Sequence, residues 1–241
     1  MVKVVISQPM YLPWVGFFSQ FSLADVFIWL DDAQFSKGSF TNRVQVKMQG
    51  GVKWMSIPLA GKGTYQEIRQ LSAQNRDWPD KHRSMLLQSF KGQPELKRAL
   101  EIFDSLPFAD ELVDTLIASV EKPAEQLDIL PKTLLKSSQM NVEGHSWERV
   151  LKLVQAVGGT EYITGHGAAR YMDHNAFEKA GVDVSYMDYD PRPWDQKHGE
   201  FTPYVNILDL FSSVPVGEVK DYFQPSTLPW QEFMKQRETQ L

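Results

Sequence analysis

The amino-acid sequence predicts an α/β protein built on a mainly parallel sheet, and two regions carry this prediction. Near the start, residues 2–7 and 25–30 are short apolar runs rich in β-branched residues, and residues 15–23 between them have helical character. Buried strands that alternate with helices form right-handed βαβ units. The pattern returns late in the chain, where residues 162–164 and 182–187 enclose another helical stretch. Strands distant in sequence are therefore expected to share one sheet.

A hairpin pattern follows the first βαβ unit. Apolar and polar residues alternate over residues 41–48, Gly50-Gly51 turns the chain, and a second strand-like run covers residues 52–59. This arrangement predicts a small β-hairpin. Residues 61–64 are expected to form a flexible link, and residues 68–71 a further short strand.

The middle of the chain has helical character. Leucine, phenylalanine and valine recur at helical spacing from about residue 78 to residue 157, with proline and glycine between the runs. We expect a helical subdomain inserted into one α/β domain that spans residues 1–241. Its apolar stripes are expected to be core, and no chemistry is assigned to them.

Composition limits the classes of function. The net charge is −5 and lysine and arginine form no dense block, which disfavours nucleic acid as a partner. The chain has no cysteine, so disulfides, a cysteine nucleophile and thiolate metal sites are excluded. No apolar run approaches the roughly 18 residues of a membrane span, and none resembles a signal peptide, so a cytoplasmic location is expected. The histidines lack metal-ligand spacing, and no metal site is predicted.

The loop after the first strand is the first candidate site. It contains Gln8, Tyr11, Trp14 and Gly16 and leads into the first predicted helix. In open parallel sheets, ligands bind beyond the carboxyl ends of the strands, where loops lead into helices. We expect Gln8 to hydrogen-bond a ligand and Gly16 to let one approach closely. The alternative is a rigid aromatic turn that only packs.

Carboxylates follow the second predicted strand. Asp32, with its neighbour Asp31, could bind a ribose hydroxyl or Mg²⁺. Neighbours in an extended chain point to opposite faces, so one of the pair is expected to face a pocket. Gln34 follows directly, and after Asn42 the guanidinium of Arg43 could grip a phosphate as a bidentate fork. The alternative is a solvated turn and a surface arginine.

Two late loops complete the candidates. Gly165 and Gly167 would allow close backbone approach to an anion, and His166 between them is either a general base or simply exposed. The long polar loop after the next strand carries Gln196 and His198 and is either functional or a structural lid. We expect all four loops to converge on one cleft.

Together these stretches resemble the WbqC-like protein family. The matching pieces are Gln8-Pro9-x-Tyr11-Leu12-Pro13-Trp14-x-Gly16-Phe17-Phe18, Ala24-Asp25-x-Phe27, Asp31-Asp32-x-Gln34-Phe35, Asn42-Arg43, Gly165-x-Gly167-Ala168, and Gln196 with the run 201–210. They span nearly the whole chain and keep their order. The resemblance implies bacterial surface-polysaccharide (O-antigen) biosynthesis, and glycyl or other acyl transfer to an amino sugar has been suggested for the family.

A weaker resemblance concerns the fold. The order of strand, aromatic turn, helix and second strand looks like pantoate ligase and related adenylate-forming nucleotidyltransferases. This implies a Rossmann-like (HUP-type) parallel sheet. Those enzymes hold ATP phosphates with two histidines in the turn, where this chain has Pro13-Trp14-Val15-Gly16. A K-M-S-K-S-like loop is also missing. ATP activation therefore does not follow from the resemblance, and the cofactor is left unknown.

The leading expectation is a transferase that moves an acyl or glycyl group to the amine of a nucleotide-linked amino sugar. The phosphate-bearing ligand would be held by Gln8, Arg43 and the loop 165–167. Asp32 would orient a hydroxyl or a metal, and His166 or His198 would take the proton from the attacking amine.

Two alternatives remain open: a relative of the adenylate-forming ligases, and a non-catalytic nucleotide- or sugar-binding protein. In each case the expected partner is a small molecule, a nucleotide or a nucleotide-sugar. The sequence leaves open whether the chain forms a homodimer.

Overall fold

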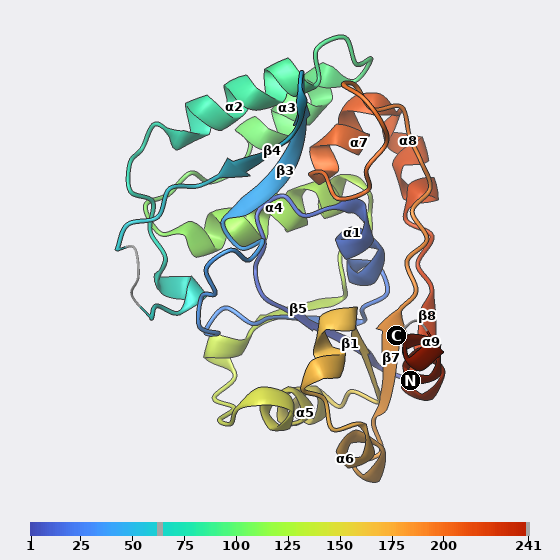
Figure 1. The fold of residues 1–241 in the computed structure, drawn as a ribbon. Coiled ribbons are helices and arrows are strands. Elements are labelled where there is room, and N and C mark those ends of the chain that lie inside the picture. Colours follow the sequence, from blue (N-terminus) through green and yellow to red (C-terminus); the bar gives the residue numbers. More distant parts are fainter. Residues whose placement is uncertain (62–64, 240–241) are drawn as a thin grey trace.

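The computed structural model describes residues 1–61 and 65–239, and within them it has one six-stranded sheet and a separate two-stranded hairpin (Figure 1). The sheet has the order β5-β2-β1-β6-β7-β8. Its strands are β1 (Lys3–Ser7), β2 (Val26–Trp29), β5 (Thr133–Lys136), β6 (Glu161–Thr164), β7 (Asp183–Met187) and β8 (Thr227–Pro229). Every neighbouring pair is parallel except β7 and β8. The predicted Rossmann-like α/β fold is therefore confirmed.

Helices cover both faces of this sheet. The α-helices are α1 (Val15–Phe21), α2 (Trp78–Ser89), α3 (Leu96–Asp104), α4 (Leu112–Gln126), α5 (Ser146–Ala156), α6 (His174–Lys179), α7 (Ile207–Ser213), α8 (Val216–Val219) and α9 (Trp230–Thr239). Short 3₁₀ helices are η1 (Ile68–Gln70), η2 (Ser137–Gln139), η3 (His166–Arg170) and η4 (Lys220–Tyr222).

The strands bury alternate side chains in two separate cores, as the period of two in an extended chain requires. Val5, Phe27 and Ile163 lie in one core, with side chains from α1, α4, the hairpin, α2, α3 and α7. Val4 and Tyr162 lie in the other, with side chains from α5, α6 and α9. Figure 1 shows the same division, with α2, α3 and the hairpin on one side of the sheet and α5 and α6 on the other. Burial on both faces explains the continuous apolar runs of β1 and β2.

The predicted hairpin is confirmed. Strands β3 (Arg43–Met48) and β4 (Gly51–Ser56) pair antiparallel, with Val44 opposite Met55. Val44, Val46 and Met55 are completely buried in the first core. The opposite face carries Arg43, Gln45 and Lys47. Of the predicted flexible link, residues 62–64 lie outside the described residues.

One predicted strand is wrong. Residues 68–71 were expected to be extended, but Ile68–Gln70 forms the 3₁₀ helix η1. The cause is local, because the Glu67 and Gln70 side chains each accept a hydrogen bond from the backbone of the other residue. Such a reciprocal capping box stabilises a helical turn.

The stretch of residues 78–157 is not helical throughout, because it contains the strand β5. Leu134 and Leu135 were assigned to helical spacing, yet they pack against opposite cores, as neighbours in a strand do. β5 pairs only with β2 and forms one edge of the sheet. A four-residue run is too short for its period to be recognised from sequence.

The order of strands determines where a ligand could bind. From β1 the chain crosses to β2 on one side, whereas β6 pairs on the other side of β1. The loops after β1 and β6 therefore diverge from adjacent strands. Such a switch point leaves a crevice at the carboxyl edge of an open parallel sheet.

Gly159, between α5 and β6, generates the first prediction. A Cβ atom there would lie 2.5 Å from Val4 Cγ2 and 2.7 Å from Val154 Cγ1. We expect Gly159→Ala to lower the free energy of unfolding by about 1–3 kcal/mol, the usual cost of overpacking a core. Urea denaturation measures this. Gly217→Ala is the control, since its Cβ would meet nothing within 4 Å, and equal stability of the two variants would contradict the prediction.

Candidate functional site

The switch point between β1 and β6 brings Gln8 and the Gly165–Gly167 segment to the same part of the carboxyl edge. Gln8 is half-buried, and its side chain has no hydrogen-bond partner among residues 1–61 and 65–239. A Cβ atom at Gly165 or Gly167 would meet nothing within 4 Å. Backbone and amide groups are therefore open to a ligand here.

His166 stands beside this opening in a defined tautomer. Its Nε2 lies 2.6 Å from the carbonyl oxygen of Met187, the last residue of β7. A carbonyl only accepts, so Nε2 carries the proton, and in the neutral ring Nδ1 keeps its lone pair. The ring centre lies 4.8 Å from that of Phe233 on α9. The imidazole is thus held in one orientation with Nδ1 as the basic atom.

Gly16 is needed for packing within the protein and not for the approach of a ligand. A Cβ atom there would lie 2.9 Å from Cδ1 of Tyr189 and 3.0 Å from Nε1 of Trp14. The expected space for a ligand at Gly16 is filled by these two rings. Tyr189 follows β7, so this contact joins the end of β7 to the start of α1.

A row of aromatic rings continues from this contact to the hairpin. Trp14 lies 4.9 Å from Phe40, and Phe40 lies 5.7 Å from Trp54, measured between ring centres. The guanidinium carbon of Arg43 lies 4.2 Å above the Trp54 ring. Nη2 of Arg43 donates to the Gly38 carbonyl, while its Nε is buried without a partner. We use the name aromatic row for the rings of Trp14, Phe40 and Trp54 together with the Arg43 guanidinium that stacks on Trp54.

Tyr189 carries a hydroxyl at the end of this row. The oxygen is buried and has no hydrogen-bond partner among the described residues. Burial raises the pKa of Tyr189 to about 12, with a contribution from the nearby Tyr204 and Asp190. The phenol therefore stays protonated at neutral pH.

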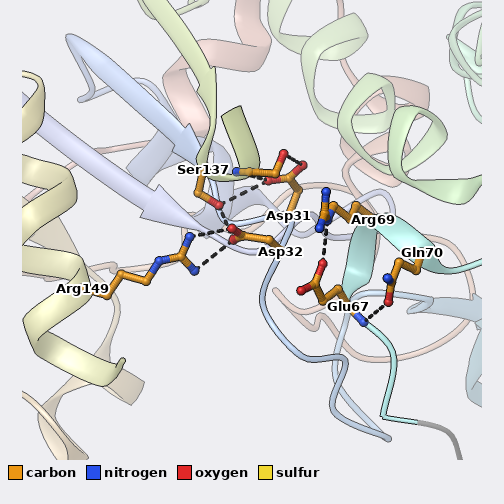
Figure 2. A network of polar contacts seen from close by, with 8 residues as sticks. Asp31, Asp32, Glu67, Arg69, Gln70, Ser137 and Arg149 are labelled. Carbon is orange, nitrogen blue, oxygen red and sulfur yellow. Dashed lines mark hydrogen bonds and ion pairs between the residues drawn. The ribbon is translucent and has the colours of Figure 1, made fainter. Parts of the chain in front are cut away.

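The carboxylates after β2 belong to a network that ties three elements together (Figure 2). Asp32 accepts two hydrogen bonds from Arg149 of α5, at 3.0 and 2.5 Å, and one from the Ser137 hydroxyl at 2.6 Å. Asp31 is buried and accepts from Ser138, through its backbone N–H and its hydroxyl, and from Ser137. Both carboxylates thus accept hydrogen bonds from other groups of the protein.

The contacts of Asp32 favour the ionised form of its carboxyl group. Partial burial alone would raise the pKa of the Asp32 carboxyl, but hydrogen bonds from Arg149 and Ser137 and the charge of Arg149 outweigh burial and lower that pKa. An ionised carboxylate held in a bidentate pair positions the loop after β2 against α5.

Three further predicted residues are held by internal contacts. Tyr11 is completely buried, and its hydroxyl lies 2.9 Å from Nδ1 of His82. Asn42 donates from Nδ2 to the Ile57 carbonyl at 2.9 Å. Gln34 is exposed in an isolated bridge with Glu67. Tyr11 is inaccessible to a ligand in this conformation, and the expectation that it binds one is not met.

Gln196 and His198 lie with the hairpin, near its turn. Gln196 accepts from Lys47 Nζ at 3.2 Å and exchanges two hydrogen bonds with the backbone of Thr202. His198 lines a cavity of about 450 Å³ with Lys47 and the Gly50-Gly51 turn. Gln196 therefore fixes the late loop to β3.

Asp209 of α7 lies close to Lys47. Burial raises the pKa of Asp209 to about 6, against a hydrogen bond from Trp194 Nε1 and the positive charge of Lys47, which both lower it. The end of β3 next to the hairpin turn therefore contacts a buried polar cluster as well as apolar side chains.

The cavity at the hairpin turn is lined by His198 and by none of the other predicted site residues. Strand order puts Asp32 two strands away from His166, a separation of about 10 Å at the usual strand spacing. His198 lies near the far end of β3 from Arg43. The predicted set of Asp32, His166 and His198 is therefore spread over three places, and His166 is the one beside the switch point.

Sequence reasoning missed Phe40, Trp54 and Arg149, and it named Tyr189 only as the start of the long loop that carries Gln196 and His198. Each lies far in sequence from its partner, and no local pattern distinguishes it from ordinary core or surface residues. The aromatic content of 12% was a general signal for ring contacts. Only the fold shows which rings line the edge.

This arrangement defines a Rossmann-like α/β protein with a switch point between β1 and β6 at the carboxyl edge of its sheet. The chain belongs to the WbqC-like protein family, whose pattern it matches over residues 8–221. It is 31% identical to an uncharacterized protein of Mycobacterium tuberculosis, Rv1507c, over 242 residues that cover 93% of this chain and 98% of that protein. No solved structure matches the chain.

Two further findings concern the residues that the structure describes. None of their helices is long and apolar enough to cross a lipid bilayer. Their histidines, aspartates and glutamates form no group of three or more that could hold a metal ion.

The Asp32–Arg149 pair generates the second prediction. We expect Asp32→Asn to lower the free energy of unfolding at pH 7 by about 2–3 kcal/mol, since a half-buried guanidinium loses its charge partner. The folded pKa of Asp32 lies below the unfolded value of about 3.9. The stabilisation is therefore complete above that value and is lost as pH falls through the folded pKa.

Denaturant melts from pH 7 to pH 2.5 measure this effect. The matched control is Asp104→Asn, which breaks an exposed pair with Arg83 and should cost less than about 1 kcal/mol. Equal losses in the two variants, or a difference from wild type that grows toward low pH, would count against the assignment.

Proposed function

We propose that the chain binds a nucleotide-linked amino sugar at the β1–β6 switch point and transfers an acyl group to its amine, as a cytoplasmic enzyme of bacterial surface-polysaccharide biosynthesis. The observation that supports binding is that Gln8 and the Gly165–Gly167 segment follow adjacent strands, and that a Cβ atom at Gly165 or Gly167 would meet nothing within 4 Å. The choice of substrate is supported by membership of the WbqC-like family, for which a role in surface-polysaccharide biosynthesis has been suggested.

The phosphates would lie along the glycine segment and reach Arg43. Glycines at 165 and 167 leave the backbone open to an anion, because a Cβ there meets no other atom. Arg43 is rigidly stacked on Trp54, and a planar guanidinium suits a bidentate phosphate contact. The base or sugar ring would pack on the aromatic row.

His166 would act as the general base. The amine nitrogen attacks the carbonyl carbon of an activated acyl donor, an ester or thioester, and an N–C bond forms. The bond from that carbon to the leaving group breaks with its electron pair. The proton of the amine passes to Nδ1 of His166, because Nε2 already donates to Met187. Asp32 would position the neighbouring loop through Arg149.

The third prediction separates ligand binding from stability with two glutamines. Gln8→Ala should leave the unfolding free energy almost unchanged and weaken binding of a nucleotide-linked amino sugar, because its amide has no internal partner. Gln20→Ala should lower the free energy of unfolding by about 1 kcal/mol and leave ligand affinity almost unchanged. The reason is that it removes the hydrogen bond from Gln20 Nε2 to the Ile163 carbonyl at 3.1 Å.

Calorimetric titration with a panel of nucleotides and nucleotide-linked amino sugars gives the affinities, and urea melts give the stabilities. A stability loss in Gln8→Ala with unchanged affinity would show that Gln8 is structural. ATP in the same panel tests the relation to adenylate-forming ligases.

The fourth prediction concerns the base. His166→Ala should retain binding and slow acyl transfer by roughly 10²–10⁴-fold, the usual contribution of a positioned base. His198→Ala is the control and should transfer at nearly the wild-type rate, because His198 lies in the separate cavity at the hairpin turn.

Mass spectrometry of the acylated sugar measures the transfer. Normal rates in His166→Ala would remove His166 from the mechanism. Binding by the wild type without any product, over a range of acyl donors, would instead favour a non-catalytic sugar-binding protein.

A further inference from the structure

A cavity of about 380 Å³ lies between α4 and the edge strand β5, and none of the predicted site residues lines it. Its apolar wall includes Ile117, Ala118 and Leu134. Its polar lining includes Glu121 and Lys136. The volume is in the range of small-ligand sites, which begins at about 300 Å³.

Glu121 places a carboxylate in the wall of this cavity. One of its carboxylate oxygens accepts the indole N–H of Trp29 at 3.0 Å. Trp29 is almost completely buried and stacks on Phe17 at 6.4 Å. The indole therefore cannot move, and it fixes the carboxylate in one orientation. The second oxygen has no hydrogen-bond partner among the described residues.

The charge of Glu121 is not needed for this hydrogen bond. A neutral amide would accept the indole N–H equally well, whereas a half-buried carboxylate pays a desolvation cost. Burial raises the pKa of Glu121, and the hydrogen bond from Trp29 and the charges of Lys136 and Lys122 offset this only in part. A carboxylate that lies in a cavity wall despite this desolvation cost is suited to bind a cation.

The protein's own cation beside the cavity is already paired. Lys136 Nζ lies 2.8 Å from Asp114 Oδ1, and both residues line the cavity. The lining therefore holds two carboxylates against one ammonium. The uncompensated negative charge lies at Glu121, next to an apolar wall that would contact the carbon skeleton of a ligand.

We propose that this cavity is a second binding site, in which Glu121 binds the primary ammonium group of a compact polar molecule. An amino sugar and an amino acid both carry this group, and the shared chemistry is the ammonium. The site goes beyond the function proposed above, because it lies at the β5 edge of the sheet, while the switch point lies between β1 and β6.

Titration of the ¹⁵N-labelled protein with four probes tests the site. Glucosamine and L-alanine carry the ammonium, and N-acetylglucosamine and N-acetyl-L-alanine are their neutral counterparts. The Trp29 indole N–H resonance reports directly on Glu121 through their hydrogen bond. We expect at least one ammonium probe to shift this resonance with a millimolar or tighter dissociation constant, and its acetylated form to bind at least 10-fold more weakly.

Glu121→Gln is the variant that carries the test. It keeps an acceptor for the Trp29 indole, so the fold is retained, but it removes the charge, and affinity should fall at least 10-fold. Glu125→Gln is the matched control on the same helix, where an exposed pair with Lys122 at 3.2 Å is lost, and affinity should not change.

The identity of the probe that binds distinguishes an amino-sugar site from an amino-acid site. The proposal is overturned if neither ammonium probe binds, if the acetylated forms bind equally well, or if Glu121→Gln binds as wild type does. Because the probes carry no nucleotide, failure here leaves the proposal for the switch point untouched, and failure there leaves this one untouched.

Discussion

The structure depends on the burial of β1 on both of its faces and both of its edges. This strand of five residues pairs with β2 on one side and β6 on the other. Val4 and Val5 are completely buried in opposite cores. Gly159 lies so close to Val4 that no side chain fits between them. Because β1 is buried and paired on both edges, the strand ends from which the loops after β1 and β6 start are held at fixed positions.

The carboxyl edge is divided into parts with different physical roles. At the β2–β5 end, carboxylates, serines and Arg149 satisfy one another, so this end is rigid. At the β1–β6 position, the Gln8 side-chain amide has no hydrogen-bond partner among the described residues, and a Cβ atom at Gly165 or Gly167 would meet nothing within 4 Å. Polar groups that are already paired gain little from a ligand, whereas unpaired ones gain a hydrogen bond. This contrast separates the half of the edge whose polar groups are paired within the protein from the half where we propose that a ligand binds.

Two of the indole–carboxylate pairs among the described residues differ in how the charge of the carboxylate is balanced. Trp194 donates to Asp209 at 2.7 Å, and Trp29 donates to Glu121 at 3.0 Å. Asp209 lies deep in the protein, and the charge of Lys47 acts on it from within the same cluster. Glu121 faces a cavity, and the nearest lysine on its wall is paired with Asp114. The first pair is complete without a ligand, and the second leaves its carboxylate available to one.

The sequence by itself determined the α/β class, the strands β1, β2, β6 and β7, the hairpin and the family. Continuous apolar runs and strict alternation of apolar and polar residues are local signals. They can be read from the sequence without knowledge of the tertiary contacts. It also pointed to the loops after β1 and β6 as a candidate site, since every parallel strand ends at the same edge. Only the tertiary structure decided that β5 is a strand, because its four residues carry no readable period and are stabilised by pairing with β2. Only the tertiary structure decided that Asp32 is paired with Arg149, that Tyr189 fills the space at Gly16, and that His198 lies away from His166. These outcomes depend on contacts between residues that are tens to more than a hundred positions apart, and no local pattern encodes which of them will meet.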